Sequence, residues 1–251
     1  MMSSVKDEFG ARINPVSINI ETLEFLNDYI NNNQVNSVLE FGSGVSTEFW
    51  SEKLPDSQIL SFDNSRRYAK ITNSRISKIH DNIHVQFAPL RRMNFFGIQY
   101  ISYNISKHLR SRAPTNPFDI VFIDGPPGFL HAREATLFQC MNYIDENTMI
   151  IIDDAEREIE RQTIHRWGLM FDMVDLQFHT MGAKEIATFR IVPKPKLASL
   201  PHNDIHTRWN MTKLLWTFRK RNTMHNLWLL KMKLLNREPF PDQVIEQNED
   251  Q

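Results

Sequence analysis

The stretch from Val38 to Thr47 constrains the fold of this chain more than any other part of its sequence. It runs Val38-Leu39-Glu40-Phe41-Gly42-Ser43-Gly44-Val45-Ser46-Thr47. The apolar residues before Glu40 predict a buried strand, and residues 48–54 predict a helix. Gly42 and Gly44 allow a tight turn because they have no Cβ atom. A strand, a glycine turn and a helix start, in this order, bring the backbone close to a ligand at a helix N-terminus.

The spacing of the glycines separates two classes of ligand. Dinucleotide-binding enzymes use Gly-x-Gly-x-x-Gly, but the third glycine position is Thr47 in this chain. The pattern acid-x-Gly-x-Gly, in contrast, is complete. The residues that we predict to contact a ligand are Glu40, Gly42, Ser43, Gly44, Ser46 and Thr47, the last two also as helix caps. A purely structural strand-to-helix turn is the alternative.

A second acid, Asp63, ends the next predicted strand, at residues 57–62. It follows Gly44 by 19 residues, and an acid about 20 residues after a glycine turn often binds the ribose hydroxyls of a nucleotide. Asn64, next to it, is a further candidate contact. An acid at this position is expected for a dinucleotide and for any other adenosine-containing cofactor, so Asp63 does not distinguish between these two classes of ligand. The alternative is a solvated acid in a turn.

Acids also follow the predicted strands at residues 118–123 and 148–152. Asp124 opens the stiff turn Asp-Gly-Pro-Pro-Gly, and Asp153 and Asp154 follow the second of these strands. Three carboxylates at one edge of a sheet repel one another unless a cation or a proton intervenes. Oxygen ligands suit Mg²⁺ or Mn²⁺, so we predict a metal site at Asp124, Asp153 and Asp154. The alternative is that Asp153 or Asp154 caps the following helix.

The predicted elements alternate as strand and helix five times and end in a pair of strands, at residues 172–179 and 185–192. With the acidic residues above, residues 36–192 resemble the class I (Rossmann-like) methyltransferases that depend on S-adenosylmethionine (SAM). The resemblance implies an α/β fold with a doubly wound, mostly parallel seven-stranded sheet. It also implies SAM at the glycine turn, with Glu40 near the methionine ammonium of the cofactor.

The Asp-Gly-Pro-Pro-Gly turn is most similar to that of methyltransferases of sugar and surface-polysaccharide pathways, which implies a hydroxyl of a sugar or glycan-type acceptor. An alcohol is a weak nucleophile at neutral pH and needs a base or a metal. Metal-dependent O-methyltransferases carry a lysine shortly after the acid that corresponds to Asp124. This chain has Pro126 and Pro127 there. His131, seven residues after Asp124, and Asp124 itself are therefore the candidate catalytic bases.

The net charge and the cysteine content exclude few classes of partner or compartment. The net charge of −1 over 251 residues gives no overall argument for nucleic acid. The single cysteine excludes an intrachain disulfide and fits a reducing compartment. The first residues lack the apolar segment of a signal peptide, and the sequence has no run of 18 apolar residues. We therefore expect a cytoplasmic protein.

Prolines at 193, 195 and 201 predict a linker between a methyltransferase domain, residues 1–193, and a helical extension, residues 194–251. Residues 208–237 contain eight Lys or Arg and no Asp or Glu, interleaved with Trp and Leu. A pair of helices with this composition predicts contact with the inner face of a membrane. Packing on the domain itself or on a second copy in a homo-oligomer is the alternative, and nucleic acid is the least favoured partner.

Residues 91–116 interrupt the alternation of strands and helices and are rich in Phe and Tyr. We predict a crossover helix and a cap segment near the acceptor, with a plain packing helix as the alternative. Two other functions stay open at this point. One is an NAD-type oxidoreductase, and the other is a catalytically weak, membrane-associated binding protein with the same fold.

Overall fold

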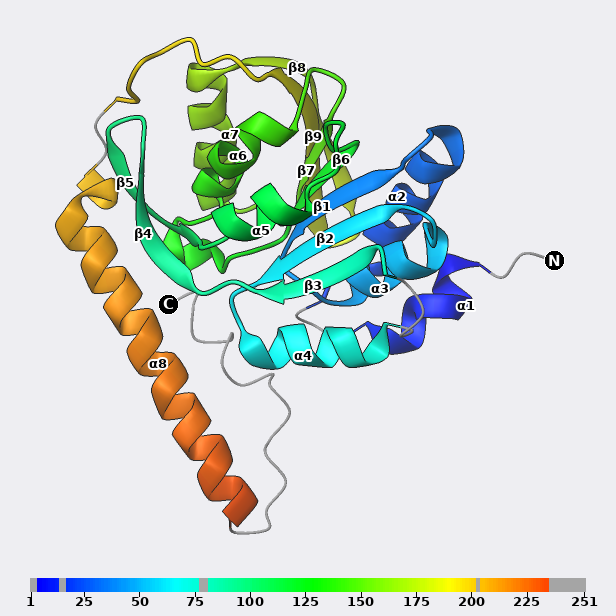
Figure 1. Cartoon of the computed structure of the whole chain (residues 1–251), viewed down its shortest axis with the longest axis horizontal. Coiled ribbons are helices and arrows are strands. Elements are labelled where there is room, and N and C mark those ends of the chain that lie inside the picture. The colour runs from blue at the N-terminus through cyan, green and yellow to red at the C-terminus, as the bar shows by residue number, and fades with distance from the viewer. Residues whose placement is uncertain (1–3, 14–16, 77–80, 202–203, 235–251) are drawn as a thin grey trace.

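The computed structural model describes residues 4–13, 17–76, 81–201 and 204–234, and it is built around one seven-stranded sheet (Figure 1). The strands are β1 (Ser37–Phe41), β2 (Gln58–Asp63), β3 (Ile83–Phe87), β4 (Leu90–Phe95), β5 (Ile98–Tyr103), β6 (Ile120–Ile123), β7 (Met149–Ile152), β8 (Asp172–Met181) and β9 (Lys184–Val192). The α-helices are α1 (Val5–Phe9), α2 (Ile20–Asn32), α3 (Val45–Lys53), α4 (Arg66–Arg75), α5 (Ser106–Arg112), α6 (Glu134–Cys140), α7 (Glu158–Met170) and α8 (Arg208–Leu234).

The sheet has the strand order β3-β2-β1-β6-β7-β9-β8. The first five strands in this order are parallel, whereas β9 runs antiparallel to both β7 and β8. The predicted mostly parallel, seven-stranded sheet is therefore confirmed. The antiparallel strand of the predicted closing pair lies one place inside the sheet, because β8 takes the edge.

The register of the central strands brings their carboxyl ends together. Phe41 of β1 lies opposite Phe62 of β2 and Ile123 of β6, and Ile123 lies opposite Ile152 of β7. The residues that follow these four strands thus leave the sheet at one edge. In open α/β sheets, ligands bind outside this edge.

Side chains of the sheet alternate between two apolar cores. Leu39 and Phe41 of β1 join the core under α5, α6, α7 and α8, and Val38 joins the core under α1 to α4. Trp50 and Trp167 are fully buried, one in each core. Burying a large apolar side chain contributes roughly 1.5–3 kcal/mol, so both layers of helices hold the sheet firmly.

Only the last part of the segment 91–116 forms a helix on the way to β6, although we predicted a crossover helix for the segment. It begins in the β4–β5 hairpin, whose turn has Phe96 and Gly97 at φ 51° and 80°, and it ends with the short helix α5. Aromatic and β-branched residues favour strands, and a glycine at positive φ is what a hairpin turn requires. The prediction missed this because the aromatic residues were assigned to a helix.

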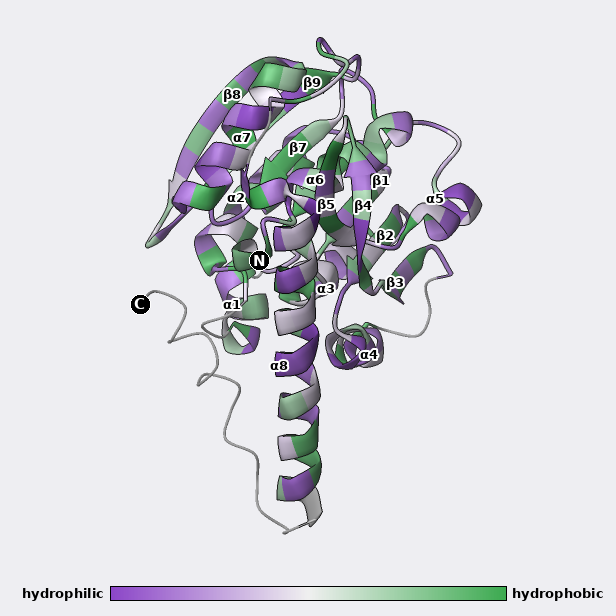
Figure 2. Ribbon diagram, turned by 90° about the vertical axis from the view of Figure 1, so that its left-hand side faces the viewer, coloured by the Kyte–Doolittle hydropathy of each residue, from purple (hydrophilic) through white to green (hydrophobic). Residues whose placement is uncertain are grey.

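Within the described residues, the basic segment that starts at residue 208 forms one α-helix, not the predicted pair. Residues 208–234 contain neither Gly nor Pro and many good helix formers, so α8 runs uninterrupted for 27 residues. Met211 and Leu215 in its first half are buried in the core of the sheet, and its second half projects beyond the domain (Figure 2). No helix among the described residues has the length and apolar character to cross a membrane. Residues 235–237 of the predicted basic segment lie outside the described residues.

Candidate active site

The glycine loop follows β1 and packs on the turn after β6. Gly42 has φ 101°, and a Cβ atom there would lie 3.1 Å from the backbone of Asp124. Gly44 is different, because no atom lies within 4 Å of the place of its missing Cβ. The first glycine thus permits close contact between two backbones, while the second leaves an open surface that a ligand can approach.

The buried acid Glu40 supports this loop from within the protein. Its carboxylate accepts hydrogen bonds from the hydroxyls of Thr47 and Ser61, both at 2.5 Å, and from Trp50 Nε1 at 3.2 Å. Burial raises the pKa of Glu40 to about 7, although these donors act in the opposite direction. Because its side chain is fully buried, the structure shows Glu40 bonding loop and helix, and a direct contact with a cofactor stays a prediction.

The helix after the loop begins earlier than predicted. Its first residue is Val45, and Gly44 is the N-cap without a side-chain bond of its own. The hydroxyl of Thr47 accepts the N–H of Gly44 at 3.0 Å. Ser46 and Thr47 are both buried, so Thr47 acts on the loop, and the predicted contacts of these two residues with a ligand stay predictions.

Asp63, at the end of β2, ties the glycine loop to the start of α4. Its Oδ2 accepts hydrogen bonds from Ser43 N at 3.1 Å and Ser43 Oγ at 2.8 Å, and its Oδ1 accepts from Ser65 N at 2.6 Å. Burial raises the pKa of this carboxyl. The structure therefore brings Asp63 and the loop together as the spacing predicted, with Asn64 beside them and partly exposed.

Tyr103, which the sequence analysis did not single out, lies against both turns. The side chain comes from the end of β5 and packs on Phe41, with ring centroids 5.7 Å apart. A Cβ atom on Gly125 would overlap the Tyr103 hydroxyl. This hydroxyl is fully buried and has no hydrogen-bond partner among the described residues. The β4–β5 hairpin thus places an unused hydroxyl donor beside the glycine loop.

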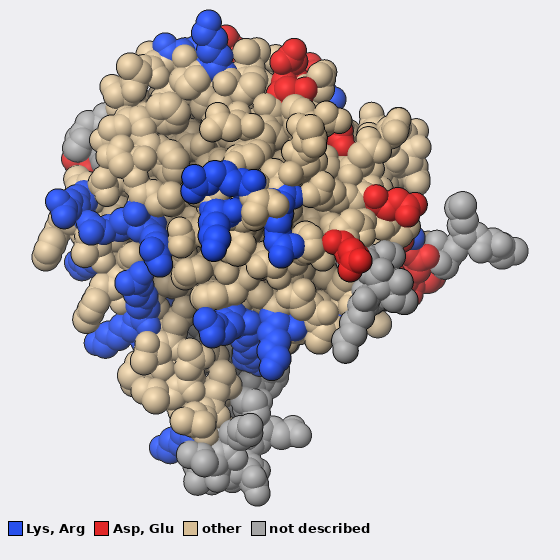
Figure 3. Space-filling view, viewed as in Figure 1, with Lys and Arg blue, Asp and Glu red and all other residues tan. Residues whose placement is uncertain are grey.

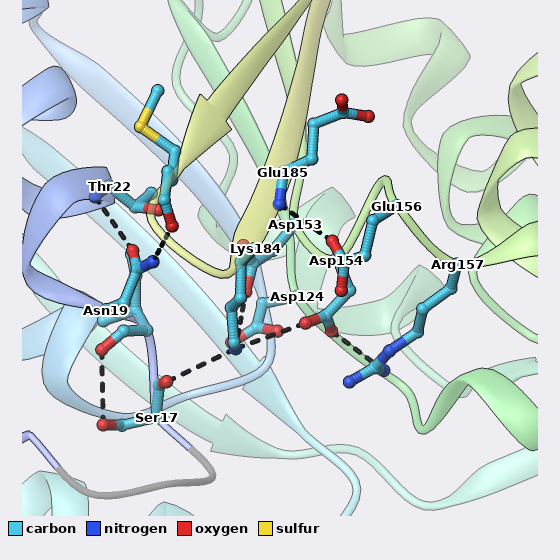
Figure 4. A network of polar contacts seen from close by, with 12 residues as sticks. Ser17, Asn19, Thr22, Asp124, Asp153, Asp154, Glu156, Arg157, Lys184 and Glu185 are labelled. Carbon is cyan, nitrogen blue, oxygen red and sulfur yellow. Dashed lines mark hydrogen bonds and ion pairs between the residues drawn. The ribbon is translucent and has the colours of Figure 1, made fainter. Parts of the chain in front are cut away.

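The three predicted metal ligands are close together (Figure 4). Asp124, Asp153 and Asp154 each offer a carboxylate oxygen, and these oxygens lie within 4.8 Å of one another. The side chains of Asp153 and Asp154 are 0% and 4% exposed, whereas that of Asp124 is 25% exposed. Only Asp124 is therefore open to an acceptor. The alternative of helix capping does not hold, because the N-cap of α7 is Arg157.

Two cations that the sequence analysis missed enter this acidic cluster. Arg133, just before α6, donates to Asp154 Oδ2 at 2.9 Å and to the carbonyl oxygens of Asp124 and Asp153 at 2.8 and 2.7 Å. Lys184, at the start of β9, has its Nζ 3.2 Å from Asp154 Oδ1 and 3.6 Å from Asp153 Oδ2 (Figure 4). An ammonium group thus reaches the cluster from a distant hairpin, although Pro126 and Pro127 follow Asp124 in the sequence.

Burial and these charges shift the pKa values of the three carboxyls in different directions. Burial and the charge of Asp153 raise the pKa of Asp124 well above its usual range, and burial and Asp154 raise the pKa of Asp153. Burial would also raise the pKa of Asp154, but Arg133 and Lys184 outweigh it and lower this pKa. Burial would lower the pKa of Lys184, and the carboxylates more than offset it. A proton is therefore held most readily at Asp124 and Asp153.

His131, the other predicted base, packs against His206. The residue has φ 49° and ends a 3₁₀ turn just before α6. Its ring neighbours that of His206, with the centroids 6.0 Å apart. Burial lowers its pKa. The position resembles that of a packing residue, and a catalytic role of His131 stays a prediction.

Solved structures of methyltransferases share this architecture. A putative O-methyltransferase from Klebsiella pneumoniae has a TM-score of 0.53 and 18% identity, and the match covers 75% of this chain and 88% of that one. An O-methyltransferase from Bacillus cereus, in complex with SAH, has a TM-score of 0.54 and 16% identity, with 76% and 92% covered. The chain has the Rossmann-like methyltransferase fold.

A third structure belongs to this group. The O-methyltransferase TomG from Streptomyces achromogenes, in complex with SAM, has a TM-score of 0.52 and 15% identity, with 75% of this chain and 86% of TomG covered. Identities this low describe a shared fold. No family model and no curated protein matches the sequence.

Proposed function

We propose that this chain transfers a methyl group from SAM to a hydroxyl group of a sugar or glycan-type acceptor. The observation that carries the proposal is the position of three features at one edge of a methyltransferase-like sheet: the open surface at Gly44, the carboxyl of Asp63 and the exposed side of Asp124. SAM, when bound, supplies a methyl group on an activated sulfonium. The chain then has to hold the cofactor, orient the acceptor and take up a proton.

Asp124 is the better candidate for the catalytic base. It is the only one of the three aspartates with an exposed side, and a carboxyl whose pKa is raised is the stronger base once it is ionised. Arg133 and Lys184 hold the neighbouring carboxylates of Asp153 and Asp154 in place. His131 is the second candidate, because it follows the same turn.

Binding of S-adenosylhomocysteine (SAH), measured by calorimetry, tests the cofactor site. We expect wild type to bind SAH and Asp63→Ala to bind it about tenfold more weakly or worse, because hydrogen bonds to a charged group contribute about 1.5–3 kcal/mol. Asp56→Ala is the matched control, since Asp56 is an exposed acid in the turn before β2. It should bind SAH like wild type.

Three outcomes of these titrations count against the proposal. Equal SAH affinity in Asp63→Ala and wild type would exclude the proposed ribose contact. Binding of NADH but not SAH would favour the oxidoreductase. SAH binding without transfer of a labelled methyl group to any glycan hydroxyl would favour a binding protein with this fold.

A divalent metal at Asp124, Asp153 and Asp154 is also part of the proposal. The oxygen donors suit Mg²⁺ or Mn²⁺, and both carboxylate oxygens of Asp153 are without a hydrogen bond among the described residues. Lys184 is the competing cation in this cluster. A metal ion here would assist deprotonation of a hydroxyl acceptor.

Removal of Lys184 should therefore strengthen metal binding. We expect Lys184→Met to bind Mn²⁺ about tenfold more tightly than wild type or better, because a positive charge about 4 Å away repels a cation by more than about 1.4 kcal/mol. Electron paramagnetic resonance of free Mn²⁺ measures the affinity directly. Absence of Mn²⁺ binding in both proteins, or full activity in EDTA, would exclude the metal.

The membrane contact predicted for residues 208–237 belongs to the proposal as well. Its support is the composition of α8, which has no acid among residues 208–234. A cytoplasmic location and the homo-oligomer stay predictions, and so does the boundary after residue 193.

A further inference from the structure

Positive charge is concentrated in two segments of a chain whose net charge is −1. Residues 64–118 contain ten Lys or Arg and a single acid, Asp81. Residues 208–234 contain seven Lys or Arg and no acid. The segments are about 90 residues apart in the sequence, so only the tertiary structure decides whether their charges act together.

The fold places both segments on one face of the molecule. Helix α8 packs on the β4–β5 hairpin, where Arg219 Nη2 donates to the carbonyl oxygen of Leu90 at 3.3 Å. Helix α5 follows the same hairpin, and its His108 contacts Phe62 of β2. In the view of Figure 3, Lys and Arg gather over these elements and over α4, while most of the acids visible in this view lie at its right-hand side and its top.

We call this surface the basic face and define it by its exposed basic residues. They are Arg66, Arg67 and Lys70 of α4, Arg91 and Arg92 of β4, Lys107 and Arg110 of α5, and Arg208, Lys213, Arg219, Lys220, Arg221 and Lys231 of α8.

Large apolar side chains are also exposed along α8. Trp209 and Trp216 are 75% and 62% exposed, and Leu227 and Leu230 are both 54% exposed. Their spacing of 7, 11 and 3 residues places all four on one stripe of the helix. Lys220 belongs to this stripe too, and its Nζ lies 5.3 Å from the centre of the Trp216 ring. The stripe thus combines positive charge with apolar surface.

We propose that the basic face docks on a membrane of anionic lipids, with α8 lying along the headgroups. This contact includes a surface of the folded domain besides the membrane contact proposed above for residues 208–237, and it does not depend on methyl transfer. Basic side chains near an anionic leaflet each contribute about 1 kcal/mol of attraction, and Trp residues favour the boundary between headgroups and acyl chains. Among the described residues no helix spans a membrane, so the contact is peripheral.

Two other occupants fit these observations less well. A nucleic acid would bind through positive charge, but it gives no reason for exposed Leu227 and Leu230 on the projecting half of α8. A second copy paired through α8 would bring two helices without acids against each other, and like charges repel. A lipid surface accounts for the charge and the apolar stripe together.

Sedimentation of the full chain with lipid vesicles tests the proposal. We expect binding to vesicles of phosphatidylcholine with phosphatidylglycerol and little binding to phosphatidylcholine alone. Added salt should weaken the charged part of the binding, because it screens exposed charges. Failure to bind the anionic vesicles at low salt would overturn the proposal, whatever the result with SAH.

Single charge reversals test whether the folded domain, besides α8, contributes to vesicle binding. Arg91→Glu in β4 should weaken vesicle binding by about tenfold or more, because it replaces an attraction with a repulsion. Lys194→Glu, an equal change at an exposed residue after β9, is the matched control and should change binding less than about twofold. Equal effects of the two changes would contradict a defined face.

The apolar stripe needs its own variant. Trp209→Ser with Trp216→Ser should remove most of the binding that resists salt, since both rings are exposed and their loss creates no cavity in the core. Unchanged salt-resistant binding would exclude insertion of α8. Tighter binding of duplex DNA than of anionic vesicles at the same salt, lost in Arg91→Glu, would instead assign the face to nucleic acid. Unaltered SAH affinity in these variants would show that a loss of vesicle binding is independent of the proposed methyltransferase function.

Discussion

Replacing Arg133 with Met is expected to lower the free energy of unfolding by about 3–5 kcal/mol, the cost of breaking a buried ion pair. The guanidinium is 4% exposed and lies among the carboxylates of Asp154, Asp124 and Glu160, at 2.9, 3.5 and 3.5 Å. It also donates to the carbonyl oxygen of Pro126 at 3.2 Å. Met fills a similar volume but carries no charge and donates no hydrogen bond, so Asp154 and Glu160 become buried charges with fewer partners.

Urea denaturation followed by circular dichroism measures this loss, and Arg157→Met is the matched control. Arg157 contacts the same Asp154 oxygen at 3.0 Å, but its side chain is 48% exposed. Exposed ion pairs contribute less than about 1 kcal/mol, so the control should change stability little. If Arg133→Met does not fold, Arg133→Lys keeps the charge and should show an intermediate loss. Equal losses for Arg157→Met and Arg133→Met would contradict the central position of Arg133.

The stability of Glu40→Gln relative to wild type should rise by roughly 2–3 kcal/mol as the pH increases from 5 to 8. Burial raises the pKa of Glu40 to about 7 from an ordinary value of 4.5. Between these values the folded chain holds a proton that the unfolded chain has released. Wild type therefore has its full stability from this group below pH 4.5 and loses it as the pH rises through 7. Gln cannot ionise, so the variant lacks this loss.

Unfolding in urea at several pH values between 5 and 8 measures the difference. Glu52→Gln in α3 is the control, because its side chain is 44% exposed and exposed charges contribute little to stability, so its difference from wild type should stay small. A constant difference for Glu40→Gln as well would mean that the carboxylate is charged at low pH, with Thr47, Ser61 and Trp50 stabilising it fully.

Much of the architecture could be predicted from local sequence patterns. The strands that end at Phe41, Asp63, Ile123 and Ile152 are short apolar runs, and each ends in an acid or is followed by an acid or a glycine turn. Because parallel strands end at one edge of a sheet, the neighbourhood of Asp63 with the glycine loop, and of Asp124 with Asp153 and Asp154, followed from strand order. The β4–β5 hairpin was missed because aromatic residues occur in strands and helices alike.

The sequence by itself determined the strands, the turns and the set of acids at the edge of the sheet, since side-chain alternation and the backbone freedom of glycine act over a few residues. Only the tertiary structure decided which cations meet those acids, which hydroxyl lies beside the glycine loop, and that distant basic segments share a face. Arg133, Lys184 and Tyr103 reach the site from three different elements. The physical reason is that the energy of a buried charge depends on what surrounds it in space, and no local pattern contains that information.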